Sequence, residues 1–284
     1  CSAATLTSTV TTDVIAYDFD QQLRVGDGAV RWETVGVAGA ILVSLVLAGL
    51  RARMAGRRPD DLLFVVLGAV PGAVVGGRVG YVLLHPAFFL AEPGRILDPG
   101  VGSLELTVGV VGGALTGALV ALLLDGRPGR WLHVAAVPML VAVAGGKLAA
   151  VLGGTGQGLP TGGEPATQYL GAGPWGSLAP ALPAIPAQAL EAVAVGIVLV
   201  VVASLALLGP FRRRDGRLFL VALAGLAIAR AAVATTWRDP LILGPLRAEQ
   251  IIDLWLRDEV QRRYTCYGVY PLVAGQRPDY SDIE

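Results

Sequence analysis

Four ionisable side chains interrupt long apolar stretches of this chain, and they are Arg78, Lys147, Glu191 and Arg230. A charge in the hydrocarbon layer of a membrane is costly, so a residue of this kind marks a functional site by default. Each lies roughly five to seven residues from the end of its stretch that we place at one common membrane face, which at 1.5 Å per residue is roughly 8–10 Å below that boundary. Three positive charges and one negative charge at a common depth indicate a pocket for an anionic ligand, of which a phospholipid headgroup is the obvious example.

The composition supports a membrane setting for these charges. Hydrophobic residues make up 54% of the 284 residues and charged residues only 15%, with a mean hydropathy of +0.63. Soluble domains carry about 25% charged residues. The formal net charge is zero, so the chain has no basic surplus that would favour nucleic acid.

The pattern predicts an all-α polytopic membrane protein with about six transmembrane helices. We expect them at residues 34–50, 62–84, 103–124, 131–152, 186–208 and 218–237. They would form a membrane domain over 34–237, between an outer segment 1–33 and an outer tail 238–284. Glycines within the spans are expected to let helix backbones approach closely.

Arginines set the expected orientation, because short positively charged loops stay in the cytoplasm. They gather after the first, third and fifth spans, at Arg51, Arg53, Arg57, Arg58, Arg127, Arg130, Arg212, Arg213, Arg214 and Arg217. The alternate connections, 85–102 and 153–185, contain only Arg95. Both termini are therefore predicted on the outer face of the membrane. Residues 86–102 are expected along the interface, and the Gly- and Pro-rich segment 153–185 is expected to be an irregular loop.

The residues at the start of the sequence suggest a lipid modification. Cys1 is followed by Ser2-Ala3-Ala4, and mature bacterial lipoproteins begin in this way, with the thiol carrying a diacylglycerol. We therefore expect lipidation at Cys1, the signal peptide being absent from this sequence. A start at this residue for unrelated reasons stays open, as does a Cys1–Cys266 disulfide, which would exclude lipidation.

Several short motifs resemble, in the same order, those of the prolipoprotein diacylglyceryl transferase family. They are Gly76-Gly77-Arg78-Val79-Gly80-Tyr81-Val82-Leu83, Val111-Gly112-Gly113-Ala114, Gly146-Lys147-Leu148-Ala149-Ala150-Val151-Leu152-Gly153-Gly154, Pro186-Ala187-Gln188-Ala189-Leu190-Glu191, Arg230 and Glu249-Gln250-Ile251-Ile252. The resemblance covers roughly residues 14–253. It implies an enzyme that moves diacylglycerol from phosphatidylglycerol to a cysteine, with no metal or other cofactor. It also adds Gln188 to the four charged residues as a candidate headgroup ligand.

The departures from the family pattern concern its catalytic residues. The essential histidine corresponds to Val111 and the signature arginine to Lys147. Further family positions are occupied here by Glu33, Ala150, Gly153, Thr155 and Ala234, and the seventh span is missing. A thiol needs a base that titrates near neutral pH, usually histidine, and valine cannot serve. His85 and His133 lie at span ends, where interfacial roles are usual, so we predict no catalytic residue.

The outer tail predicts contact with another protein. Residues 247–264 favour an amphipathic helix with Ile251, Leu254, Trp255 and Val260 on or near one face, and four of the seven tyrosines lie between 264 and 280. Tyrosine is enriched at interface hot spots. We expect Trp255, Tyr264, Tyr267 and Tyr270 to anchor the tail on a partner subunit.

These features led us to favour a non-catalytic, transferase-like subunit, a pseudoenzyme that binds anionic phospholipid and scaffolds a larger membrane complex. The alternative is an active phosphatidylglycerol–prolipoprotein diacylglyceryl transferase with a rebuilt base. The four charges could also form an ion-pair network that only fixes helix packing. A small-solute transporter is a third class, weakened by the lack of detectable inverted repeats.

Overall fold

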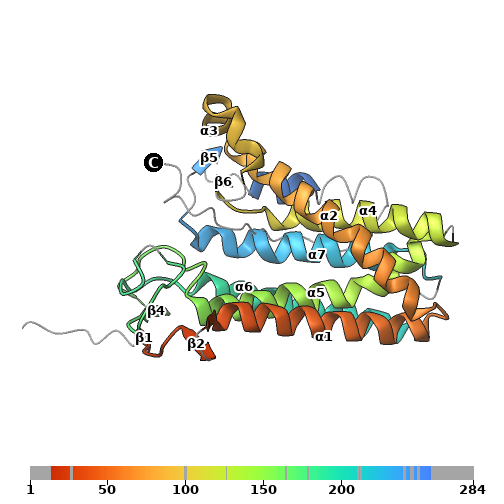
Figure 1. The fold of residues 1–284 in the computed structure, drawn as a ribbon, viewed down its shortest axis with the longest axis horizontal. Helices are drawn as coiled ribbons and strands as arrows, with labels where there is room; N and C mark the ends of the chain where they lie inside the picture. The colour runs from red at the N-terminus through yellow and green to blue at the C-terminus, as the bar shows by residue number, and fades with distance from the viewer. Residues whose placement is uncertain are drawn as a thin grey trace, which may run out of the picture.

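The computed structural model is an elongated bundle of six long helices (Figure 1). It describes residues 14–25, 28–98, 101–125, 127–163, 165–177, 179–209, 211, 213–238, 241–243, 246–247 and 250–256. The long helices are α1 (Trp32–Met54), α2 (Pro59–Leu84), α4 (Leu106–Asp125), α5 (Pro128–Gly153), α6 (Ala187–Leu208) and α7 (Arg217–Val233). Within the described part of the chain, each is long and apolar enough to cross a membrane. The predicted all-α polytopic fold is confirmed.

Shorter elements gather at one end of this bundle, at the left of Figure 1, and the arginine-rich connections occupy the other end. They include α3 (Pro86–Ala91) and two 3-10 turns (Pro93–Leu97 and Ala234–Thr236). Strands β2 (Gln22–Val25) and β3 (Gly28–Arg31) form a hairpin, and β5 (Leu241–Leu243) pairs antiparallel with β6 (Leu246–Arg247). Residues 250–256 form a further helical segment, here named the C-terminal helix.

The segment 153–185 is not wholly irregular, so that expectation needs correction. Strand β4 (Ala166–Tyr169) pairs in parallel with β1 (Val14–Tyr17), more than 140 residues earlier in the chain. The rings of Tyr17 and Tyr169 stack at 5.0 Å, and Trp175 packs against Tyr169 at 4.8 Å. The pairing depends on this distant partner strand, and a Gly/Pro-rich sequence gives no local sign of it.

Small residues bring the helices close together, as the glycine content predicts. In the contact of α2 with α4, a Cβ added to Gly112 would collide with the carbonyl oxygen of Gly72. In the contact of α1 with α5, a Cβ added to Gly145 would lie 2.6 Å from the Cβ of Ala40. These backbones therefore approach to a distance that no larger side chain permits.

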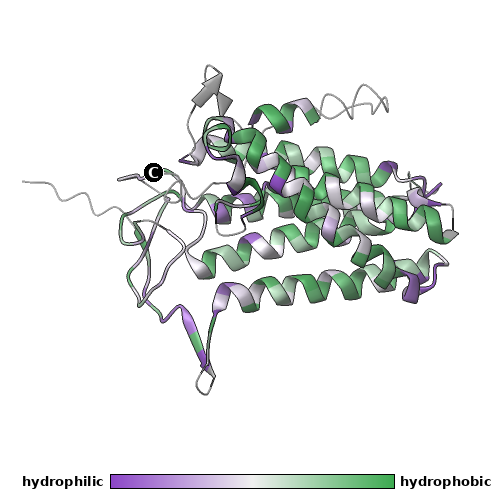
Figure 2. Ribbon diagram, turned by 45° about the horizontal axis from the view of Figure 1, so that its top comes forward, coloured by the Kyte–Doolittle hydropathy of each residue, from purple (hydrophilic) through white to green (hydrophobic). Residues whose placement is uncertain are grey.

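The bundle carries apolar residues on its outer faces as well as inside (Figure 2). Leu67, Val193 and Ile197 are about three-fifths exposed, as expected of side chains that meet lipid tails. The main core joins α5, α6 and α7, where Leu140, Leu218 and Leu226 are fully buried. A helix that is apolar all round indicates a membrane span. The polar residues inside the bundle therefore stand out as exceptions that need partners.

Candidate functional site

Three of the four charges singled out in the sequence meet inside the bundle. Glu191 of α6 lies between Lys147 of α5 and Arg230 of α7. Its Oε2 is 2.8 Å from Lys147 Nζ, and its Oε1 is 3.3 Å from Arg230 Nη1. Glu191 and Arg230 are fully buried and Lys147 nearly so. The one negative charge of Glu191 thus offsets part of the positive charge of both cations, and charges buried in a low-dielectric interior need such partners.

Glu105 completes this network and was missed in the sequence. Its Oε1 lies 3.4 Å from Arg230 Nη2. The same carboxylate accepts hydrogen bonds from the backbone N–H groups of Thr107, at 2.8 Å, and of Val108. It therefore caps the N-terminus of α4, where the exposed N–H groups and helix dipole favour an anion. An acidic residue just before an apolar span was the signal that could have revealed it.

Asp253 is a second carboxyl group that sequence reasoning missed. It lies on the C-terminal helix and is only 2% exposed. Burial raises its pKa well above the usual value, and the nearby Glu105 and Glu191 carboxylates add to this effect. The charge of Arg230 and the hydroxyl of Thr107 act in the opposite direction. The C-terminal helix buries Gln250 and Asp253 and exposes Trp255. The fully buried residues of this helix are therefore polar, and Trp255 of the predicted apolar face is exposed.

The side chains of Glu105, Lys147, Glu191, Arg230 and Asp253 are named the outer cluster, after the membrane face that the sequence predicts for this end of the bundle. The indole of Trp237 closes one side of it, with Lys147 Nζ 5.1 Å and Arg230 Cζ 6.0 Å from the ring centre. An aromatic face attracts cations when water is excluded. The two cations are matched by Glu105 and Glu191, and Asp253 is the fifth group, whose charge depends on pH.

Gln188, predicted as a headgroup ligand, lies one turn before Glu191 on α6 and is buried. Its Nε2 donates to the hydroxyl oxygen of Tyr169 at 3.0 Å, and that hydroxyl donates to the carbonyl oxygen of Val151 at 2.8 Å. This chain of hydrogen bonds ties α6 to β4 and to the end of α5. In this structure, Gln188 therefore positions helices next to the outer cluster.

Arg78, the fourth predicted charge, is engaged elsewhere. Its guanidinium donates to four backbone carbonyl oxygens of the segment after α3, at Ile96 (2.6 Å), Val101 (2.7 Å), Arg95 (2.7 Å) and Asp98 (3.0 Å). It also lies 5.2 Å from the centre of the Phe89 ring. Beside it is an apolar hollow of about 490 Å³, lined by residues such as Val75, Val79 and Leu104. Arg78 thus holds residues 95–98 and Val101 against the end of α2.

Four of the residues that depart from the family pattern fall into two places. Glu33 accepts a hydrogen bond from Thr155 Oγ1 at 3.0 Å and pairs with Arg31 at 3.2 Å. A Cβ added to Gly153 would collide with the Glu33 carboxylate, so these three substitutions fit one another. Val111 instead packs against the apolar core.

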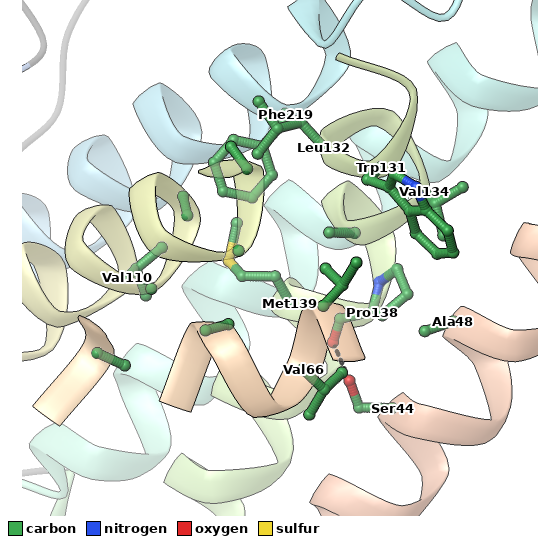
Figure 3. Close-up of a pocket in the computed structure, with 18 of the residues that line it drawn as sticks. Ser44, Ala48, Val66, Val110, Trp131, Leu132, Val134, Pro138, Met139 and Phe219 are labelled. Atoms are coloured by element: carbon green, nitrogen blue, oxygen red, sulfur yellow. Dashed lines mark hydrogen bonds between the residues drawn. The ribbon is translucent and has the colours of Figure 1, made fainter. Parts of the chain in front are cut away.

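A second hollow lies deeper in the bundle and is almost entirely apolar. It measures about 290 Å³ and lies among α1, α2, α4, α5 and α7. Figure 3 shows Val66, Met139 and Phe219 around it, with Trp131 at one side. The hydroxyl of Ser44 donates to the carbonyl oxygen of Pro138 at 2.6 Å. The walls of this hollow suit hydrocarbon rather than a polar ligand.

Fold and site together define a multi-pass membrane protein with a buried, nearly neutral charge cluster. Comparison with known proteins names the family: the model of the prolipoprotein diacylglyceryl transferase family matches residues 21–256, and the chain belongs to that family. With six apolar helices and this membership, the protein is a multi-pass protein of the bacterial inner membrane.

The relatives are each called phosphatidylglycerol–prolipoprotein diacylglyceryl transferase. The one from Azoarcus sp. (strain BH72) is 33% identical over 195 residues, which is 62% of this chain and 66% of that protein. The one from Trichormus variabilis is 25% identical over 239 residues, 82% of this chain and 83% of that one. The chain spans about half the length of the Streptococcus agalactiae relatives, with 28% identity over 129 residues, or 44% of this chain.

The remaining predicted sites fall mostly outside the described residues. Cys1, Cys266, Tyr264, Tyr267 and Tyr270 all lie there. Trp255 is described and is 65% exposed. Lipidation at Cys1 and docking through the tail therefore stay predictions.

Proposed function

We propose that the protein transfers a diacylglyceryl group from a phospholipid to a cysteine thiol at the outer cluster. One observation carries the proposal, namely a buried carboxyl group with a raised pKa, Asp253, beside the buried cation Arg230. The names of the relatives support the same reaction. This activity was the alternative in the sequence analysis.

The reaction needs a proton acceptor and a stabilised leaving group. The thiol sulfur forms a bond to the terminal glyceryl carbon, the bond from that carbon to the phosphate oxygen breaks, and the phosphate leaves with the electron pair. The thiol proton must pass to a base that titrates near the working pH. Val111 cannot act as this base, whereas burial raises the pKa of the Asp253 carboxyl well above its usual value. We assign the base to Asp253.

The two cations would hold the phosphate. Arg230 is paired on two sides, with Glu191 and Glu105. The ammonium of Lys147 pairs with Glu191, and its side chain keeps 11% exposure. A phosphate would therefore compete first for Lys147, which is a point charge with three donors that can change partners. Arg230 would then stabilise the leaving phosphate from the side held by Glu105.

Apolar hollows would take the acyl chains. One lies beside Arg78, at the end of the bundle that carries α3, and measures about 490 Å³. Burial of each CH₂ of an acyl chain contributes about 0.8 kcal/mol. An apolar hollow at this end of the bundle supports binding of a phospholipid rather than of a free headgroup.

The second candidate function is the non-catalytic, lipid-binding subunit of a membrane complex. It is favoured by a specific observation: the cations of the outer cluster already have carboxylate partners, as in a network that only fixes helix packing. In this case the exposed Trp255 would mark the contact with the partner subunit.

Complementation of a bacterial strain depleted of its own transferase separates the two functions. We expect growth with the wild-type protein and none with Asp253→Asn, which keeps size and hydrogen bonding but cannot accept a proton. Asp215→Asn, at the opposite end of the bundle, is the matched control and should rescue growth. If the wild-type protein is inserted in the membrane at normal levels and growth still fails, the second candidate replaces the first.

A further inference from the structure

The arginine-rich end of the bundle holds a hollow that the reaction does not use. It measures about 490 Å³ and lies between α1, α5, α6 and the connection from α6 to α7. Arg51, His133 and Arg214 contribute its polar wall, and Met54, Leu207 and Phe211 are among its apolar residues. The distribution of arginines assigns this end to the cytoplasmic side.

A proline in α5 fixes the position of Arg51. Pro138 has no backbone N–H, so the carbonyl oxygen of Val134, four residues earlier, lacks its usual helical partner. The Nε of Arg51 donates to that oxygen at 3.3 Å. The guanidinium is therefore held by one edge at the wall of the hollow.

Arg214 reaches the same hollow from a strained backbone. Its φ is +49°, in the left-handed region that favours glycine, and its N–H donates to the carbonyl oxygen of Phe211 at 3.1 Å. A residue other than glycine is strained in this conformation, and strain of this kind clusters at ligand clamps. The turn holds an arginine where glycine would fit more easily.

The two charged side chains that line the hollow, Arg51 and Arg214, are both positive. Arg51 and Arg214 lie close enough to repel each other. Within the described ranges, neither has a carboxylate at ion-pair distance, whereas the neighbouring Arg217 pairs with Asp215 at 3.2 Å. The Nδ1 of His133 is buried and, among the same residues, has no hydrogen-bond partner. Asp215 is near enough to His133 to act on its charge, but it pairs with Arg217. Two neighbouring guanidinium groups that no described carboxylate reaches at ion-pair distance are suited to an anion, and arginine matches phosphate geometry in particular.

We propose that this hollow is a second phosphate site, which binds the headgroup of an anionic phospholipid from the membrane leaflet at the arginine-rich end. The lipid source follows from the apolar wall, since Leu207 is 87% exposed and Met54 68% exposed beside the basic residues. The site is separate from the outer cluster, because Arg214 precedes the first turn of α7 and Arg230 is in its last. It goes beyond the proposed transfer reaction and does not depend on it.

The test uses the full-length protein and variants that change the site without harming the fold. Arg214→Gly removes one charge at a position where the backbone favours glycine, and Arg51→Gln removes the other. The matched control is Arg53→Gln with Arg213→Gln, two exposed arginines of the same connections that do not line the hollow. Both pairs of substitutions lower the net charge equally.

Native mass spectrometry of the protein with phosphatidylglycerol, with phosphatidylcholine and with inorganic phosphate provides the readout. We expect the wild-type protein and the control to retain one more phosphatidylglycerol than the variant with both Arg51→Gln and Arg214→Gly. Each single variant should bind that lipid about tenfold more weakly, the effect of losing one charge-assisted contact.

The outcomes separate the possible sources of the phosphate. If inorganic phosphate occupies the site with the same dependence on Arg51 and Arg214, the anion site stands and free phosphate replaces the lipid as its ligand. If the control loses lipid as strongly as the site variant, the binding is diffuse attraction to a basic surface and the proposal fails. It also fails if the site variant binds phosphatidylglycerol as the wild-type protein does.

Discussion

The two charged regions of this bundle differ in how their cations are paired and buried. In the outer cluster, Lys147 and Arg230 each pair with a carboxylate and are nearly or fully buried. Arg51 and Arg214 line the same hollow at the arginine-rich end, repel each other and are only partly buried. The regions lie at opposite ends of α7, which spans roughly 25 Å at 1.5 Å per residue.

The difference follows from access to water and headgroups. A charge taken out of water must be paired, because desolvation otherwise exceeds what the fold can offset. A charge at the membrane boundary can stay unpaired until an anionic ligand arrives. The outer cluster is therefore part of the fold as well as a site, and a phosphate there must replace an existing partner. The arginine-lined hollow needs no such exchange.

The largest expected effect on stability comes from Glu191→Gln. This change leaves Lys147 without its carboxylate partner and Arg230 with one of two, and breaking a buried pair in this way costs about 3–5 kcal/mol. Asp215→Asn is the control, because its partner Arg217 is 61% exposed and an exposed pair contributes about 0–1 kcal/mol. Thermal unfolding in detergent measures both. Equal losses of stability in the two variants would mean that the buried pairs of the outer cluster contribute no more than the exposed pair at the arginine-rich end.

A smaller loss is expected from Gly112→Ala, on the helix whose start is capped by Glu105. The added methyl group would collide with the backbone of α2, and overpacking of this kind costs about 1–3 kcal/mol. Gly196→Ala on α6 is the control, since a Cβ there meets nothing within 4 Å. It should stabilise by up to about 1 kcal/mol through helix propensity. A neutral Gly112→Ala would show that the α2–α4 contact is looser than the structure has it.

The pH dependence of stability reports on Asp253. Its pKa is raised in the folded state, so the native protein keeps a proton that the unfolded chain has already lost. The resulting stability is present below the unfolded pKa of the carboxyl group and is lost as pH rises through the folded pKa. Asp253→Asn stays neutral, so its stability relative to the wild-type protein should increase with pH. Melting temperatures from about pH 5 to about pH 9 test this, and parallel curves for the two proteins would contradict it.

The smallest expected effect is that of Arg214→Gly on stability. Relief of the positive φ favours the folded state, and the added freedom of glycine favours the unfolded state. We expect the free energy of unfolding to change by less than about 1 kcal/mol, measured in the absence of added phospholipid. A larger loss would show that Arg214 belongs to the fold, as the outer cluster does, and would remove the contrast between the two ends.

Much of the fold could be predicted because the membrane imposes it locally. A stretch of apolar residues must form a helix in lipid, and the predicted span 62–84 is observed at Pro59–Leu84. The depth argument also placed Lys147, Glu191 and Arg230 correctly, since all three meet in one network. It also grouped Arg78 with these three residues, but the donors of Arg78 are taken up by nearby carbonyl groups.

The remaining features depend on contacts between distant segments. Glu105 lies 125 residues before Arg230 in the chain, and Asp253 follows Arg230 on a separate helix. Neither carboxyl group lies in a local motif that predicts its contact with Arg230. The strand pair β1–β4 likewise forms only when residues 14–17 meet residues 166–169. The sequence predicts no catalytic residue because Val111 replaces a histidine, and nothing in the sequence pattern indicates Asp253, the carboxyl group that we propose as the base.

The most direct test of the central claim is a transfer assay with Asp253 varied. The purified protein in phosphatidylglycerol vesicles would be mixed with a lipobox cysteine peptide, and mass spectrometry would detect the diacylglyceryl thioether. We predict product with the wild-type protein, at a rate that rises with pH as Asp253 ionises and that falls at least about 100-fold in Asp253→Asn. No product from folded wild-type protein, or an equal rate and pH profile in the variant, would contradict the account.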